Sequence, residues 1–488
     1  MVRRRRSSPS PTSEPPPSPP GVEADDRQTP GGPWSRPFRP LTAGLLLTIG
    51  AAAFEALTVA TILPAVVKDL GGLRAYGWVF SAFMLASLIG IALAGGEADR
   101  HGPARPFAVG VGLFVVGLLI GGASPSMPVL IAGRAVQGFG SGAIGAVAYV
   151  VIGRGYPDAA KPRMLALLSS AWVVPGLVGP ALAGVVADGV GWRWVFLGLT
   201  PLLLIASVLA LPALHRIPGG SATERDRRRI ARAVQLAAGT GLLLVGLGAA
   251  DFRLAVPVAI AGAALGWPAL RALTPAGTVR AAPGLPAAIA TMGLLTLSFF
   301  GADAFVPLAL TELRGRSNTF AGVALTAATI TWTTGSWVQA RYARRIGRVV
   351  LVRSGLVLVG LGIAGVALTL SPAVSVILAP IAWGVAGLGM GLAFATISMV
   401  VLETAPVGQE GAATSSMSLA NTLGIAVGAG IGGVLVAASG TADRPSRSGL
   451  LIHDLLMIGV VAVAVAVAGR LPRRPPPLAE PAVADTRM

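Results

Sequence analysis

Long apolar runs separated by short polar breaks constrain this chain more than any other feature, from Leu41 to about residue 470. A helix needs about 20 apolar residues to cross the ~30 Å hydrocarbon core of a membrane. Backbone groups cannot stay unpaired in lipid, so each run predicts one membrane-spanning helix. The pattern predicts an all-α membrane protein with fourteen spans, near residues 41–66, 76–95, 106–123, 127–152, 163–187, 194–211, 231–250, 254–270, 284–310, 319–340, 349–370, 374–402, 411–437 and 449–469.

The composition agrees with a protein that lies in a lipid bilayer. Apolar residues make up 53% of the chain, charged residues make up only 12%, and the mean hydropathy is +0.73. Soluble domains carry about 25% charged residues. Because the bilayer is the solvent for most of this chain, we expect few buried ionisable groups, and those few are candidates for function.

Several kinds of chemistry are excluded by what the chain lacks. Without Cys, it has no disulfide, no thiolate metal site and no Cys nucleophile. Its three histidines, His101, His215 and His453, are too scattered for a metal site. Neither Lys68 nor Lys161 follows a glycine-rich run, which excludes a phosphate-binding loop of the GxxxxGK type. We expect no metal, no cofactor and no catalytic residue, and hence no enzyme.

The net charge of +17 raises nucleic-acid binding as an alternative, and the placement of the basic residues argues against it. A nucleic-acid binder gathers Lys and Arg on one face or arm, whereas here they fall in the gaps between apolar runs. With the N-terminus cytoplasmic, 29 of the 38 Lys and Arg lie on the cytoplasmic side, 8 lie outside and Arg134 lies within a span. Cytoplasmic loops carry the excess of Lys and Arg, so we predict an inner-membrane protein with both termini cytoplasmic.

The spans divide the chain into five regions. The first residues are rich in Pro, Ser and Arg and hold too little apolar surface to fold, so they predict a disordered tail. We expect a cytoplasmic tail, a six-helix bundle, a basic loop with two linking helices, a second six-helix bundle and a further cytoplasmic tail, at residues 1–36, 37–212, 213–283, 284–470 and 471–488.

The chain repeats itself weakly at an offset of about 249 residues. The segment from Arg134 to Gly142 in the fourth span matches the segment from Trp383 to Gly391 in the twelfth. Residues 179–184 in the fifth span match residues 428–433 in the thirteenth. Parallel halves that rock about a site at their interface are a recurring transporter design, so the repeat favours a transporter over a receptor or a membrane enzyme.

A polar segment after the second span reads Gly95-Gly-Glu-Ala-Asp99-Arg100-His-Gly102-Pro-Ala-Arg105. It resembles the GxxxDRxGRR loop of the major facilitator superfamily, which latches the cytoplasmic side in one conformation. Gly95 is expected to let two helices approach closely. Pro and Ala replace two basic residues of the family pattern, and a basic loop that only sets topology is the alternative.

Arg134-x-x-Gln137-Gly138 in the fourth span resembles the RxxQG motif of the same family. An Arg inside a span costs about 3 kcal/mol on insertion scales and is usually functional. The guanidinium stays protonated, so Arg134 cannot carry a proton itself. It can tune how firmly a neighbouring carboxylate holds one. A structural arginine that is satisfied by carbonyls is the alternative.

In the fifth span, the motif Pro175-Gly176-x-x-Gly179-Pro180-x-x-Ala-Gly184 resembles the antiporter motif GxxxGPxxGG. Small residues of this kind let helices pack closely, which is also the alternative interpretation. With the segment around Glu55 in the first span, the motifs make nearly the whole range from 41 to 470 similar to the fourteen-helix drug:proton antiporters. The resemblance implies export of small lipophilic or cationic compounds, multidrug efflux and antibiotic resistance, in exchange for protons by alternating access.

Two carboxylates lie deep in spans and are candidates for carrying the proton. Glu55 lies about 16 Å from the outer end of its span, and Asp303 and Arg134 lie about 10 Å from theirs. We therefore expect the three side chains to line one cavity, with Glu55 first in rank as coupling residue, Asp303 second and Arg134 as the tuning group. Asp303 as a gate residue is an open alternative. Asp454, near the outer start of the last span, is expected to be interfacial.

The substrate and the partners are less constrained by the sequence. Aromatic residues in the spans, among them Trp172, Phe299 and Trp332, are candidates for lining a cavity that binds flat or cationic ligands. We expect a monomer whose partners are the lipid bilayer, protons and a small-molecule substrate, without nucleic acid. A dedicated metabolite exporter and a proton-coupled uptake symporter of the same fold remain alternatives, and a receptor or enzyme without transport is the least favoured.

Overall fold

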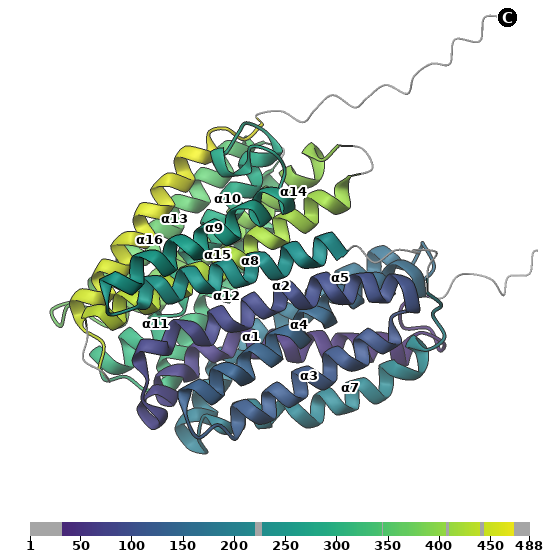
Figure 1. The fold of residues 1–488 in the computed structure, drawn as a ribbon, viewed down its shortest axis with the longest axis horizontal. Helices are drawn as coiled ribbons and strands as arrows, with labels where there is room; N and C mark the ends of the chain where they lie inside the picture. The colour runs from purple at the N-terminus through teal and green to yellow at the C-terminus, as the bar shows by residue number, and fades with distance from the viewer. Residues whose placement is uncertain (1–31, 220–226, 344, 407–408, 440–443, 473–488) are drawn as a thin grey trace, which may run out of the picture.

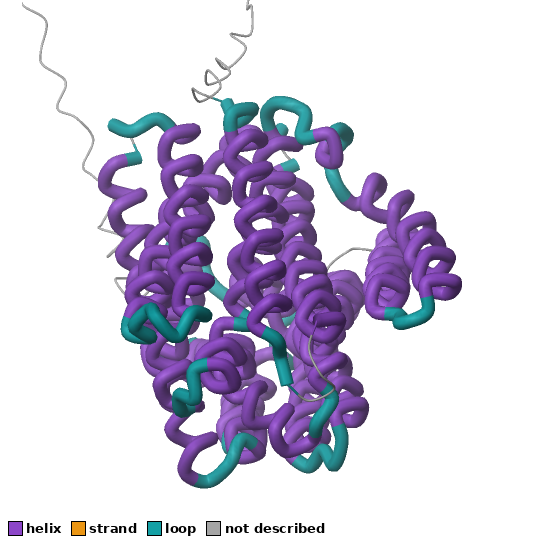
Figure 2. Tube along the Cα trace, turned by 90° about the vertical axis from the view of Figure 1, so that its left-hand side faces the viewer, coloured by secondary structure: helices purple, strands orange, loops and turns teal. Residues whose placement is uncertain are grey.

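A computed structural model describes residues 32–219, 227–343, 345–406, 409–439 and 444–472. Most of the two predicted tails, 1–36 and 471–488, lies outside these ranges. Residues 32–36 of the first tail form turns at the start of α1, where the hydroxyl of Thr42 donates to the carbonyl of Pro33 at 2.7 Å. The described residues form helices and turns, with no strand among them (Figure 2).

Fourteen long helical segments follow one another in the described chain, as the apolar pattern predicted. They are α1 (Arg39–Leu70), α2 (Tyr76–His101), α3 (Ala104–Gly122), α4 (Met127–Gly155), α5 (Lys161–Gly189), α6 and α7 together (Arg193–Leu197, Leu199–Leu214), α8 (Arg227–Gly248), α9 (Phe252–Leu273), α10 with α11 and a π turn (Leu285–Asp303, Val306–Leu308, Ala309–Leu313), α12 (Asn318–Tyr342), α13 (Arg348–Thr369), α14 (Leu378–Thr404), α15 (Glu410–Ser439) and α16 (Arg447–Ala468).

Thirteen of these segments are long and apolar enough to cross a membrane. The fourteenth, α12, has 25 residues and is more polar because it carries several threonines. Those hydroxyls are satisfied by carbonyls inside the bundle, as where Thr331 donates to the carbonyl of Gly384 on α14 at 2.6 Å. A threonine-rich helix can therefore remain at membrane depth when its hydroxyls bond within the protein.

The helices pack as two bundles, with one core of buried apolar residues mainly between residues 41 and 217 and a second mainly between 287 and 471. In Figure 1 the purple and blue helices of the first bundle lie below the green and yellow helices of the second. Between the bundles, α5 packs against α12, and α2 packs against α15. The domain boundaries that the sequence suggested remain predictions.

The two linking helices, α8 and α9, form a hairpin, and α8 packs against both α2 and α15. A Cβ atom at Gly262 would lie 2.7 Å from the carbonyl of Gly239, and one at Gly246 would lie 2.7 Å from Cα of Ala259. Glycine thus permits the close approach of the two backbones. Two internal prolines, Pro257 and Pro268, do not interrupt α9, so the span with the least regular sequence is a continuous helix.

The two ends of the bundle differ in how the halves meet. We call the end that holds Arg39 and Ala468 the terminal side, and the end that holds Leu70 the far side. On the far side, Asp188 at the end of α5 accepts hydrogen bonds from the start of α12 in the other bundle. Tyr76 at the start of α2 donates its hydroxyl to the carbonyl of Ala304 at 2.9 Å. The halves are therefore joined on the far side.

Toward the terminal side, α2, α5 and α12 are less covered by neighbouring helices. Trp172 on α5 is 48% exposed and Trp337 on α12 is 76% exposed. A Cβ atom at Gly95 would meet nothing within 4 Å, so no helix lies against it. A separate groove of about 640 Å³ lies within the first bundle at this end, between residues 32–35 and the start of α5. The structure is thus closed on the far side and more open on the terminal side.

Candidate functional site

A buried ion pair lies at the centre of the first bundle. Arg134 on α4 and Glu55 on α1 form a salt bridge, and the exposed fractions of the two residues are 2% and 1%. The same Arg134 nitrogen donates to Oε1 of Gln137, one turn further along α4, at 2.6 Å. The structure therefore joins two of the three groups that the sequence placed in one cavity.

The second helix of the bundle fixes the guanidinium from its other side. Nε of Arg134 donates to the carbonyl of Val79 on α2 at 3.2 Å, and the guanidinium carbon lies 4.2 Å from the ring centre of Phe83. Gly138 permits this approach, because a Cβ atom there would lie 2.7 Å from Cα of Phe83. The three residues of the motif thus have complementary roles. Arg134 binds Glu55, Gln137 supports the guanidinium, and Gly138 leaves room for α2.

The ion pair leaves hydrogen-bonding capacity unused. Within the described residues, Oε2 of Glu55 and Nε2 of Gln137 are buried and have no hydrogen-bond partner. Burying polar atoms without a partner costs free energy, and such atoms call for a functional explanation. Oε2 of Glu55 is free to accept a proton while Oε1 stays on Arg134.

Asp303 lies in a different setting from the pair. It is the last residue of α10, and the helix breaks after it before α11 begins at Val306. Its Oδ1 accepts a hydrogen bond from Nε1 of Trp383 on α14 at 2.8 Å. Among the described residues, neither Glu55 nor Arg134 bonds to it. Glu55 and Arg134 are therefore in contact, whereas Asp303 bonds to a different partner, and the expectation that the three line one cavity stays a prediction.

An aromatic cluster on α10, α12 and α14 continues from Asp303. The ring of Trp383 stacks on Phe299 with centroids 5.1 Å apart, and Phe299 meets Trp332 edge to face at 5.7 Å. Phe300 and Phe394 complete the cluster, at 6.1 and 5.7 Å from Trp332. Trp332, Phe300 and Phe394 are only half-buried. We call the partly exposed surface that these three rings form the aromatic wall.

Trp172, the third aromatic residue that the sequence suggested for the substrate cavity, lies outside this cluster. It lies on α5 of the first bundle and is 48% exposed. No aromatic contact joins it to another described residue of the cluster. The structure thus brings together Phe299 and Trp332 and leaves Trp172 outside.

The small residues of α5 lie against both bundles. A Cβ atom at Gly179 would lie 3.2 Å from Cγ2 of Thr58 on α1, in the first bundle. One at Gly184 would lie 2.6 Å from Cα of Thr319 on α12, in the second bundle. Pro175, Gly176, Pro180 and Gly184 are buried along the same helix. The motif therefore forms the contact between α5 and its two neighbours, without a polar group that could bind a ligand.

The segment from Gly95 to Arg105 is mostly helical and not a loop. Helix α2 continues through His101, and Gly102, with φ of 87°, makes the turn to α3. Asp99 accepts a hydrogen bond from Arg154 at the end of α4 at 2.7 Å. The expected helix contact at Gly95 is absent in this conformation, because that end of α2 faces open space. The side chains of Arg100 and Arg105 make no hydrogen bond to another described residue.

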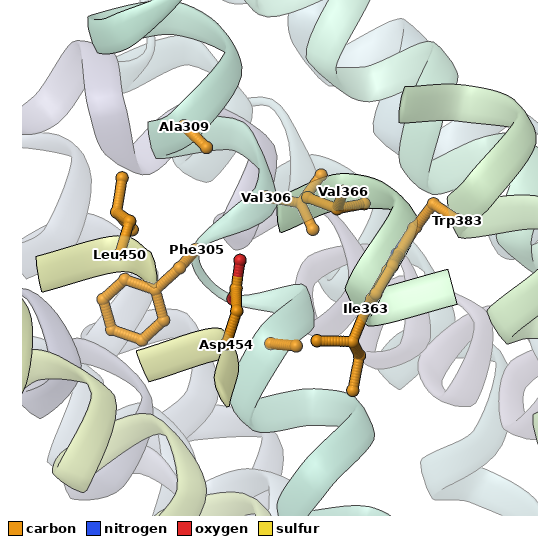
Figure 3. Close-up of a pocket in the computed structure, with 9 residues that line it drawn as sticks. Phe305, Val306, Ala309, Ile363, Val366, Trp383, Leu450 and Asp454 are labelled. Carbon is orange, nitrogen blue, oxygen red and sulfur yellow. The ribbon is translucent and has the colours of Figure 1, made fainter. Parts of the chain in front are cut away.

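A buried polar pair on α16 was not among the site residues that the sequence suggested. His453 and Asp454 on α16 are 0% and 6% exposed, so the pair is buried among packed helices. The expectation that Asp454 lies at interfacial depth stays a prediction. Figure 3 shows Asp454 among Phe305, Leu450, Ile363 and Trp383, around a small pocket at the break between α10 and α11. The signal that could have found it is the run His453-Asp454 within an apolar span, since ionisable residues at membrane depth are usually functional.

Two helical bundles, a buried ion pair in one and an aromatic wall in the other define a multi-pass membrane transporter. The sequence profile of the Major Facilitator Superfamily matches residues 45–429 and residues 297–486, and the chain belongs to this family.

Relatives with full-length similarity have names that refer to drug efflux. A Mycobacterium tuberculosis (strain H37Rv) chain named as a probable multidrug-efflux transporter is 27% identical over 457 residues, covering 90% of this chain and 96% of the relative. Multidrug transporter protein MdtP of Bacillus subtilis (strain 168) is 25% identical over 429 residues, covering 86% of this chain and 77% of the relative.

Solved structures share the fold at low sequence identity. A peptide transporter of the POT family in complex with alafosfalin has a TM-score of 0.64 at 15% identity, covering 89% of this chain and 94% of that one. The human organic anion transporter MFSD10 has a TM-score of 0.56 at 15% identity, covering 88% of this chain and 99% of that one. At such identities the likeness concerns the fold alone.

Proposed function

We propose that this transporter exports small lipophilic or cationic compounds in exchange for protons, by alternating access. The terminal side is then cytoplasmic, in agreement with the excess of Lys and Arg at that end. The conformation is accordingly one that is open toward the cytoplasm and closed toward the outside. The membrane is the inner cell membrane, and the chain acts as a monomer.

The observation that carries the proposal is the buried Glu55–Arg134 pair with its free oxygen, Oε2 of Glu55. When Glu55 is ionised, the pair has no net charge. When Glu55 binds a proton, the permanent positive charge of Arg134 is left without its counter-ion. One buried carboxylate can therefore convert the site between two charge states without any movement of the chain.

The charge states give the proton and a cationic substrate opposite preferences. An uncompensated Arg134 repels a second cation strongly in a low-dielectric site. A cation therefore binds to the ionised pair from the cytoplasm and leaves when Glu55 takes a proton from outside. This competition exchanges the proton for the cation. Glu55 carries the proton, and Arg134 prevents the proton and the cation from being bound at the same time.

The aromatic wall favours binding of a flat, lipophilic substrate. Trp332, Phe300 and Phe394 are half-buried and present ring faces and edges. Aromatic faces attract cations and stack with planar rings. The multidrug names of the relatives support the same substrate class. Asp303 holds Trp383 behind this wall, and we propose that it acts as second-ranked coupling residue by that contact.

Dye movement in inverted membrane vesicles tests the proposal. With an acid interior, the unmodified protein is expected to accumulate a planar lipophilic cation in the lumen, and Glu55→Gln is expected not to. Asp158→Asn, which removes an exposed carboxylate in the loop before α5, is the control and keeps full activity. Movement of dye out of the lumen with protons indicates a symporter, and no movement of any compound tested overturns multidrug export.

A further inference from the structure

Two ionisable side chains outside the proposed coupling site are buried on the far side. His453 and Asp454 are adjacent on α16, about 10 Å from the start of that helix. Nδ1 of His453 and Oδ1 of Asp454 lie 3.1 Å apart, and within the described residues Nε2 of His453 has no hydrogen-bond partner. An unpartnered, fully buried imidazole nitrogen calls for an explanation.

The pair lies directly behind a contact that joins the two bundles. The ring of His453 lies 4.8 Å from that of Phe305, and Phe305 lies 5.0 Å from Tyr76 of the first bundle. Tyr76 donates its hydroxyl to the carbonyl of Ala304 at 2.9 Å. Phe305 and Ala304 form the break between α10 and α11, so one short, non-helical segment contacts the pair on one face and the opposite bundle on the other.

A small cavity reaches the carboxylate. It has a volume of about 10 Å³ and is lined by Asp454, Phe305 and Trp383, together with apolar residues of α10, α11 and α13 (Figure 3). A cavity of this size holds about one water molecule. Trp383 is also the hydrogen-bond donor to Asp303, so one side chain contacts both the cavity and the carboxylate of Asp303.

The ionisable groups on the helices packed around the pair are acidic or neutral. Asp303 on α10, Tyr76 on α2 and Glu312 in the π turn are the ionisable groups on the neighbouring elements, and the far-side halves of α13, α14 and α15 carry no charged residue. On the pair's own helix, Arg447 begins α16 about 10 Å from Asp454 and is exposed. Arg314 is engaged with backbone carbonyls of the loop after α13. The pair therefore has one net negative charge when His453 is neutral and Asp454 ionised, and no net charge after it binds one proton.

We propose that the His453–Asp454 pair is a second proton-binding site, on the outer side, whose proton occupancy controls the contact of Phe305 with Tyr76. The proton-bound pair is neutral and is buried at lower cost than the charged pair. Proton binding from outside therefore favours closure of the far side, and loss of the proton favours its opening to water. This inference rests on the proposed alternating access, and it adds a proton site that is separate from Glu55.

Accessibility of a single introduced cysteine tests this in the full chain, which has no native Cys. Ser81 on α2 is fully buried between the bundles and bonds to the carbonyl of Ala426 on α15 at 2.7 Å. Ser81→Cys in purified, lipid-reconstituted protein is treated with a membrane-impermeant maleimide from about pH 5.5 to about pH 8.5, a range that brackets an ordinary imidazole. Exposed Ala123→Cys corrects for the pH dependence of the reagent.

The corrected labelling rate is expected to rise at least roughly fivefold from acid to alkaline pH, the lower end of ordinary coupling between two sites. Adding Asp454→Asn, which leaves the pair without net charge at alkaline pH, should abolish the alkaline rise in labelling, and His453→Gln should alter the profile. Asp251→Asn, a carboxylate at the exposed far-side start of α9, should leave it unchanged.

A corrected rate that does not depend on pH overturns the inference, even without any variant. So does a pH dependence that survives Asp454→Asn and His453→Gln. If Glu55→Gln abolishes dye exchange while the pH dependence of Ser81→Cys labelling persists, the two proton sites are distinct. If dye exchange fails in the unmodified protein while labelling follows pH, the proposed export is wrong, and the control of the Phe305–Tyr76 contact by the His453–Asp454 pair still holds.

Discussion

Asp188 at the end of α5 binds Thr319 at the start of α12 twice, accepting from the backbone amide at 2.8 Å and from the hydroxyl at 2.7 Å. The same carboxylate accepts from the backbone and side chain of Asn318, at 3.2 and 2.8 Å. One side chain of the first bundle therefore caps the N-terminus of a helix in the second, and it does so on the side where the bundles are closed. Carboxylates at a helix N-terminus are stabilised there.

Removing this cap should open the far side. Asp188→Ala deletes four hydrogen bonds that join the bundles, and because the site is exposed the net loss is about 1–2 kcal/mol. That is roughly a 5–30-fold shift in population. The measurement is the labelling rate of Ser81→Cys with and without Asp188→Ala. A rate that stays the same would show that this cap does not hold the bundles together.

The glycine of the α4 motif should tolerate no side chain. In Gly138→Ala the added methyl group meets the backbone of Phe83 on α2, and overpacking of this kind costs about 1–3 kcal/mol. We expect a lower melting temperature and weakened dye exchange. Gly145→Ala on the same helix is the control, because its Cβ atom would meet nothing within 4 Å. Equal melting temperatures for the two variants would contradict the packing described here.

Arg134 should not be replaceable by Lys. Its nitrogens bond Glu55, Gln137 and the carbonyl of Val79 together, and a lysine ammonium keeps the charge but loses the planar fork. Dye exchange in inverted vesicles should fall by about tenfold or more, the effect of ~1.4 kcal/mol. Arg232→Lys, whose exposed side chain on α8 bonds Gln235, is the comparison and should change it little. Retained exchange in Arg134→Lys would mean that charge alone suffices.

The aromatic wall should contribute to substrate binding through Trp332. Each aromatic contact contributes about 0.5–1.5 kcal/mol beyond buried area, so Trp332→Ala should weaken binding of a planar cation by about three- to tenfold. Trp337→Ala on the same helix, 76% exposed, is the control. Binding is measured by tryptophan-independent means, such as equilibrium dialysis of a labelled dye. Equal affinities for both variants would remove the wall from the substrate site.

The number and order of the helices could be predicted because length and hydropathy determine which segments cross a membrane. The Glu55–Arg134 contact was also within reach, since two ionisable residues inside spans must find partners. The partner of Asp303 was not. The break after Asp303 and its hydrogen bond to Trp383, 80 residues away, depend on side-chain facing, which hydropathy does not record.

The same limit applies to the surroundings of Asp454 and Gly95. Asp454 lies one or two turns inside its helix, which fits an interfacial residue by depth alone, yet α10 and α16 pack against each other and bury it. Gly95 resembles a helix contact by residue type, yet its surroundings depend on how far the terminal side is open. Depth and residue type follow from sequence, whereas burial and conformational state follow from how the bundles are arranged.

Proton release on substrate binding tests directly whether Glu55 exchanges its proton for the cation. Purified protein in a weakly buffered solution with a pH indicator receives a planar lipophilic cation, and the protons released per bound cation are counted. Release is expected from the unmodified protein, strongest at acid pH where more of the Glu55 carboxyl is protonated before binding, and none is expected from Glu55→Gln. Binding of the cation without proton release in the unmodified protein, or equal release from Glu55→Gln, would contradict exchange at this carboxylate.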